Sequence, residues 1–111
     1  MMRALVIALA MTSCSSGAVN AAGEVFGVGT ASCTHFSQAR ATVNEVAYMS
    51  WVQGWLSGIN AARKLQGQSI IDLDAMPFNA MQDFVRSYCG SHPKATVLDA
   101  GLGLLGQITG H

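Results

Sequence analysis

The chain is short and carries little charge. It has 111 residues, with 6 basic and 6 acidic side chains, and charged residues make up 11% of it, against about 25% in a typical soluble protein. Sparse and balanced charge excludes the extended basic surface that binds nucleic acid or anionic lipid, so no nucleic-acid partner is predicted.

The first 21 residues are predicted to be a secretory signal peptide. Arg3 precedes an unbroken apolar run over residues 4–11, and Val19-Asn20-Ala21 is a small-x-small cleavage pattern. The run is too short to span a bilayer, which takes about 20 residues. The residues before Cys14 loosely resemble a lipoprotein cleavage box but lack its usual leucine, so a lipid anchor at Cys14 is disfavoured. The mature protein is therefore expected in the periplasm.

Two cysteines, Cys33 and Cys89, remain after such a cleavage. In an oxidising compartment, two thiols in a small domain favour a disulfide, which here would close a long loop. Two alternatives stay open at this point. One is a catalytic thiol, and the other is a Cys2His2 metal site completed by His35 and His92, although this spacing matches no known zinc module.

The mature chain is expected to begin with a loose segment and two helices. Residues 22–31 are glycine-rich without helical periodicity and are interpreted as a flexible lead-in. A short helix is predicted to follow, with Ser32 or Thr34 as its N-cap. The longest helix is predicted over residues 44–65, because its first turn is acidic, its last turn is basic and a glycine follows.

Two further helices are predicted towards the C-terminus. One covers about residues 77–88, where apolar side chains recur at helical spacing, and Gly90 is expected to end it. The last helix is expected to take Ser91 as its cap and to turn Val97, Leu104 and other apolar residues towards the core.

No strand pattern of useful length occurs, so the sequence predicts an all-α fold. The expected architecture is a small bundle of about four helices stapled by one disulfide. Residues 32–108 form the single helical domain, and residues 109–111 form a tail. At this size a single hydrophobic core is close to insufficient, so the disulfide would contribute much of the stability.

The longest predicted helix carries the candidate binding residues. Trp51, Gly54, Trp55 and Gly58 lie in an uncharged stretch, and the two glycines are four positions apart. Each glycine costs a helix about 1 kcal/mol relative to alanine, so we expect another backbone to approach closely there. The stretch is too short and too polar for a comfortable membrane span. We therefore interpret these four residues as a helix-packing or partner-binding surface.

No catalytic residue, cofactor or metal site is predicted. Asp72 and Asp74 are acids two residues apart before a helix, a position that favours capping over acid–base chemistry. Ser57 lacks the Gly-x-Ser-x-Gly setting of a nucleophile elbow, and no phosphate-binding or dinucleotide-binding motif occurs. The sequence therefore argues against an enzyme.

The order of these features resembles a family of secreted bacterial proteins. A cysteine on a short helix, then W-x-x-G-x-x-x-G, then Tyr-Cys, His-Pro and Asp-Ala at residues 88–100 resemble HdeA-like periplasmic proteins. The same pattern is similar to immunity proteins that neutralise type VI secretion amidase effectors. The resemblance covers roughly residues 32–108. It implies a helical fold in which Cys33 and Cys89 form one disulfide between two helices.

The resemblance implies a protein-binding role with two versions. The HdeA-like version is a stress chaperone that exposes apolar surface to clients in acid, and the alternative is a periplasmic immunity protein against an amidase-type effector. The expected partner is a protein or client, or a second copy of the chain. Six acidic residues in all give a small change of charge on acidification.

Overall fold

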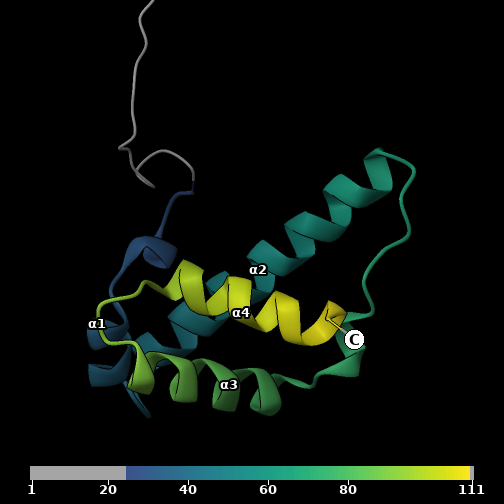
Figure 1. Cartoon of the computed structure of the whole chain (residues 1–111). Helices are drawn as coiled ribbons and strands as arrows, with labels where there is room; N and C mark the ends of the chain where they lie inside the picture. The colour runs from purple at the N-terminus through teal and green to yellow at the C-terminus, as the bar shows by residue number, and fades with distance from the viewer. Residues whose placement is uncertain (1–24, 111) are drawn as a thin grey trace, which may run out of the picture.

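The computed structural model describes residues 25–110, and all of its named elements are helical. The predicted signal peptide, Cys14 and residue 111 lie outside the described residues. Figure 1 shows α3 and α4 running antiparallel, with α2 passing across them and rising beyond them at its C-terminal end. The elements are η1 (Val28–Thr30), α1 (Cys33–Gln38), α2 (Val43–Leu65), η2 (Leu73–Ala75), α3 (Phe78–Ser91) and α4 (Val97–Thr109). The predicted all-α bundle is confirmed.

The hydrophobic core lies where α1, α3, α4 and the first half of α2 meet. It is one cluster of buried side chains, to which every one of these helices contributes. α2 contributes no fully buried residue after Leu56, so its last two turns extend beyond the core. The core consists of Cys33, Phe36, Met49, Val52, Leu56, Met81, Val85, Cys89, Val97, Ala100 and Leu104.

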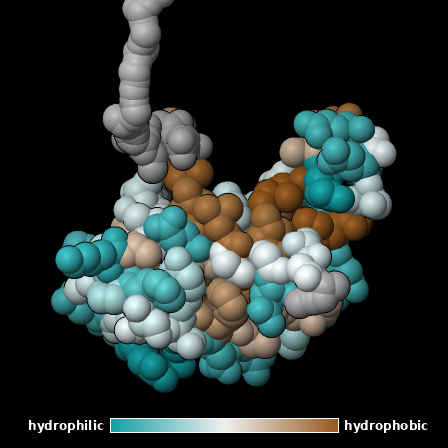
Figure 2. Space-filling view, viewed as in Figure 1, coloured by the Kyte–Doolittle hydropathy of each residue, from teal (hydrophilic) through white to brown (hydrophobic). Residues whose placement is uncertain are grey.

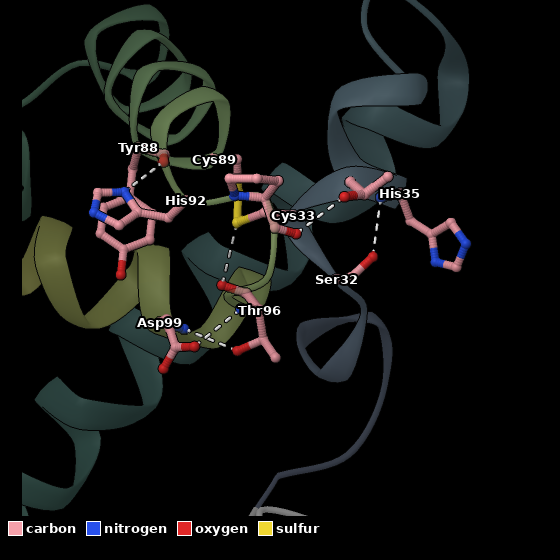
Figure 3. The surroundings of a disulfide bond; sticks show 10 residues. Ser32, Cys33, His35, Tyr88, Cys89, His92, Thr96 and Asp99 are labelled. Atoms are coloured by element: carbon pink, nitrogen blue, oxygen red, sulfur yellow. Dashed lines mark hydrogen bonds between the residues drawn. A yellow bond between two sulfur atoms is a disulfide. The ribbon is translucent and has the colours of Figure 1, made fainter.

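A disulfide between Cys33 and Cys89 joins α1 to α3, as predicted (Figure 3). Next to it, the chain enters α1 and α4 side by side. The Cys33 amide donates to the Ala95 carbonyl over 2.8 Å, and the Val97 amide donates to the Ala31 carbonyl over 2.9 Å. These bonds and the disulfide fix the six-residue α1, which is too short to be stable alone.

Three helix ends differ from the predicted ones, and one cap agrees. α2 begins at Val43 with Thr42 as its N-cap residue, one position before the predicted start at residue 44. α3 continues through Gly90 to Ser91, so Gly90 does not end it. α4 begins at Val97 rather than after Ser91, because Thr96 and Asp99 form a reciprocal capping box there. The predicted cap at Ser32 is confirmed, since its side chain accepts from the His35 amide.

The described part of the lead-in packs on α2. Residues 28–30 form the 3-10 turn η1, and Gly29 is buried against the ring of Trp51. The Trp51 indole Nε1–H also donates to the Phe26 carbonyl over 2.7 Å. A tryptophan on α2 therefore binds the described part of the segment, from residue 25 onward, through both packing and a hydrogen bond.

A buried carboxylate, Glu45, joins α2 to α3 and to the loop before α2. Its side chain is 2% exposed and receives two hydrogen bonds of 2.7 Å from the Arg86 guanidinium on α3. It also accepts from the amide of Ala41, a residue with a left-handed φ of 64°. The bonds from Arg86, opposed by desolvation and assisted by the Ala41 amide, hold the pKa of Glu45 below its usual value.

The disulfide should supply much of the stability of this small domain. Replacing Cys33 and Cys89 together by serine removes a crosslink between residues 56 positions apart, which by loop-closure entropy costs about 4 kcal/mol. Urea unfolding followed by circular dichroism should show that loss. Mass spectrometry of the unreduced protein should show the two cysteine peptides linked, and two unlinked peptides with unchanged stability on reduction would contradict the assignment.

Acid should weaken the fold through Glu45. Because its pKa is lowered on folding, the stabilisation is complete above about pH 4.3, the pKa in the unfolded chain, and is lost as the pH falls through the folded pKa. Arg86 keeps some contact with water, so Glu45→Gln should cost about 2 kcal/mol at pH 7 and little at pH 2. Urea unfolding at both pH values measures this, with Asp74→Asn, an exposed acid, as the matched control. An equal loss at both pH values would contradict it.

Candidate binding surfaces around helix α2

α2 has a buried side and an opposite side that faces solvent along the whole helix. Glu45, Met49, Val52 and Leu56 recur at helical spacing and are all buried. On the opposite side of the helix, every residue is exposed. We call this exposed line the open stripe, and it consists of Val43, Ala47, Ser50, Gly54, Ser57, Gly58, Ala61 and Leu65.

The open stripe carries no charge, which is unusual for the solvent side of a helix. A helix that packs one face on a core normally presents charged and polar residues on the other. Here the middle of the stripe is glycine, serine and alanine. Its two ends are larger, with Val43 81% and Leu65 88% exposed. The solvent side of α2 therefore differs in composition from the charged face that a surface helix usually presents.

Trp51 and Trp55 lie along the edge of the open stripe, and the ring of each packs against a glycine from another element. Their rings stack with centroids 6.3 Å apart and 9° between planes. Trp51 covers Gly29 of η1, and Trp55 lies against Gly101 of α4, where an added Cβ would come within 3.1 Å of the ring. At both positions, a tryptophan ring occupies the space that a side chain would need.

The predicted helix crossing at Gly54 and Gly58 is wrong within one chain. A Cβ built on either glycine meets nothing within 4 Å, and both residues are exposed. Met49 and Val52 pack into the core from one side of α2, and both glycines lie on the opposite side. The four predicted site residues thus separate into two sets: Trp51 and Trp55 pack internally, while Gly54 and Gly58 face open space.

A hollow with apolar walls lies beside the tryptophans. Figure 2 shows hydrophobic surface on both sides of the space between the N-terminal segment and the raised end of α2. Phe26 is 84% exposed, Val28 is exposed next to Gly29, and Leu102 is 51% exposed next to Gly101. We call the surface formed by Phe26, Val28, Trp51, Trp55 and Leu102 the tryptophan hollow.

The raised end of α2 is braced from the other side by the connector to α3. The Asn60 side chain makes two hydrogen bonds with the backbone of Ile71, of 2.8 and 2.9 Å, and the Arg63 Nε donates to the Ser69 carbonyl. Below this brace is a groove of about 330 Å³. Its lining is mixed: Gln53, Leu56, Ser57, Leu73, Asp74, Met76, Pro77, Phe78 and Met81. The brace keeps the helix extended although its last turns lack a core.

The polar residues considered for chemistry have structural roles. Both sulfurs of the imagined Cys2His2 site are taken by the disulfide. Asp72 accepts from the Asp74 amide as the cap of η2, and His92 stacks on Tyr88. Within residues 25–110, no group of three metal-binding side chains gathers, and no helix has the length and apolarity that crossing a membrane requires.

A comparison with protein-family models, curated proteins and solved structures finds no match to this chain. A function must therefore be inferred from the geometry of residues 25–110, and the HdeA-like resemblance stays a hypothesis.

The sequence interpretation missed the ends of the open stripe. Val43 and Leu65 were not singled out, although a helical wheel centred on the buried run from Met49 to Leu56 would place both opposite the core. It also missed Gly29 and Gly101, the two sites of close packing. Their partners come from elsewhere in the chain, so local spacing holds no signal for them.

Alanine substitutions should separate the two kinds of glycine. Gly54→Ala should stabilise the dilute protein by about 1 kcal/mol, because the helix gains propensity and the added methyl meets open space. Gly29→Ala should destabilise it by about 1–3 kcal/mol, because the methyl overlaps the Trp51 ring. Urea unfolding at micromolar concentration measures both. Loss of stability in Gly54→Ala would show that something packs on Gly54 within one chain.

Proposed function

We propose that the protein is an exported, non-enzymatic module that binds other proteins through the tryptophan hollow and the adjacent open stripe. One observation carries the proposal. Of eight large apolar side chains exposed in residues 25–110, six lie on or beside these two surfaces. Contiguous exposed apolar surface on a small protein is typical of a binding site. The six residues are Phe26, Val28, Leu102, Val43, Val46 and Leu65.

Two further features support export and binding. A disulfide persists in oxidising compartments such as the periplasm and is rare in the cytosol, and this fold contains one. The sparse charge of the chain adds to this, because interface cores are depleted of charged residues and enriched in aromatic ones. Trp51 and Trp55 provide the aromatic surface at the hollow.

In the HdeA-like version the partner is an unfolding client protein. Acid acts on this fold through the Glu45–Arg86 pair, which joins α2 to α3. Protonation of Glu45 would loosen the start of α2 while the disulfide still holds α1 on α3. That response would enlarge the apolar surface next to the tryptophan hollow without unfolding the whole chain.

The alternative version is an immunity protein that inhibits a secreted amidase-type effector. The small number of acidic residues favours it, because an inhibitor needs a stable surface and no acid trigger. A disulfide-linked, braced scaffold suits such a role, since a rigid surface loses less entropy on binding.

A client-aggregation assay tests the proposal. The purified protein should slow the light-scattering rise of thermally unfolded citrate synthase at neutral or acidic pH. Phe26→Ser with Leu102→Ser should weaken this about tenfold, a loss of about 1.4 kcal/mol. The matched control is Ile70→Ser with Phe78→Ser, which removes the two exposed apolar side chains outside the proposed surfaces.

A second arm covers the immunity version. The same variants are used to capture a secreted amidase-type effector encoded beside the gene. A protein that neither slows aggregation at any pH nor binds such an effector would overturn the proposed function. Equal loss in the control variant would place the binding surface elsewhere.

A further inference from the structure

We infer that the groove between α2 and the connector to α3 binds a small amphipathic amine, a molecule that joins an apolar body to one cationic head. We call this site the connector groove, and its volume is about 330 Å³. Cavities that hold small molecules in proteins begin at about 300 Å³. The site is independent of the proposed function, because the groove and the tryptophan hollow are built from different residues.

Helix geometry separates the connector groove from the tryptophan hollow. Successive residues of an α-helix are about 100° apart around its axis, so residues two positions apart lie on nearly opposite sides. Trp51 and Trp55 belong to the hollow, whereas Gln53 and Ser57, each two positions later, line the groove. A ligand in the groove therefore leaves the tryptophan hollow free.

The inner surface of the connector groove is apolar and is fixed by the core. Leu56 of α2 and Met81 of α3 line the groove, and both are buried members of the core cluster. Leu73 and Met76 of the connector also line it, and they are half-buried against the same cluster. An apolar body in the groove would therefore displace water from apolar surface, which is favourable in proportion to the area covered.

The connector wall of the groove is held in place by hydrogen bonds of the chain itself. The Asn60 side chain makes two hydrogen bonds with the backbone of Ile71. Asp72 then caps η2 by accepting from the Asp74 amide over 3.0 Å. Pro77, the N-cap residue of α3, adds a ring that restricts its own φ angle. A site with a braced wall loses little conformational entropy when a ligand binds.

The charge of the connector groove selects a cationic head. Asp74 is the one charged residue among those that line it, and the other polar side chains there, Gln53 and Ser57, are neutral. Within residues 25–110, the Asp74 carboxylate forms no ion pair and accepts no hydrogen bond. It would attract a ligand ammonium in the groove and repel a ligand carboxylate.

Two methionines make the groove tolerant of the shape of the apolar body. Met76 and Met81 carry unbranched, polarisable thioether side chains, which adjust to different apolar partners. The charge of Asp74 is the same for every ligand. The connector groove should therefore discriminate between head groups by their charge and accept apolar bodies of several shapes.

Titration of the purified protein with three matched probes tests the inference. n-Octylammonium, 1-octanol and octanoate share one tail and differ in the charge of the head at neutral pH. Octylammonium should bind about fivefold to tenfold more tightly than octanoate at low salt, with octanol between them. In protein labelled with ¹³C at the methionine methyls, the signals of Met76 and Met81 should shift. The signal of Met49, a buried core residue that does not line the groove, should stay in place.

Substitutions test the charge and the shape of the groove separately. Asp74→Asn should reduce the preference for octylammonium over octanoate to within about twofold. Asp83→Asn removes an exposed acid of α3 outside the groove and should preserve that preference. Ser57→Phe should fill the groove and prevent binding of all three probes. Ala47→Phe adds the same ring at an exposed position of α2 outside the groove and should leave binding unchanged. All four variants should keep the wild-type circular dichroism spectrum.

Two results would overturn the connector groove as a site for amines. One is equal affinity for the three probes, or no shift of the Met76 and Met81 methyls up to about 10 mM octylammonium. The other is a shift of the Trp51 and Trp55 indole signals without a shift of those methyls, which would place the probe in the tryptophan hollow. Neither result bears on protein binding, which the client-aggregation and effector-capture arms test separately.

Discussion

The Cys33–Cys89 disulfide is the interaction on which the other contacts of this fold depend. α1 has six residues and cannot hold its place by its own hydrogen bonds. Fixed to α3 by the disulfide and to the start of α4 by two backbone bonds, it places Phe36 in the core. It also positions the loop that delivers Ala41 to Glu45. Glu45 then joins α2 to α3 through Arg86, which fixes which side of α2 faces inward.

Because the rotation of α2 about its own axis is fixed, the set of residues that it exposes to solvent is fixed as well. The core uses one side of its first half, the tryptophans border that side, and the remainder stays open. The connector braces the raised end through Asn60 and Arg63, so the helix does not depend on a core for its last turns. The long exposed helix is thus a consequence of local hydrogen bonds rather than of packing. The proposed binding function rests on this exposed side of α2.

Much of the fold follows from the sequence, because its determinants are local. The helical spacing of Met81 and Val85, the cap at Ser32 and the two cysteines predicted the helices and the disulfide. The close approach of another backbone expected at Gly54 and Gly58 does not occur within one chain, for a physical reason. A glycine pair marks where a helix can be approached, whereas the rotation of the helix about its axis depends on distant residues such as Phe36 and Arg86. The packing of Gly29 and Gly101 on tryptophan rings is equally non-local.

The central claim is that the solvent side of α2 is covered when the protein is at work. Amide hydrogen exchange, read by mass spectrometry over residues 57–65, tests it most directly. These last turns lack a core, so their amides should exchange rapidly in the dilute protein. The account predicts marked slowing there in the presence of unfolding citrate synthase, with little change in α3. Unchanged exchange over residues 57–65 under this condition, with protection only elsewhere, would contradict it.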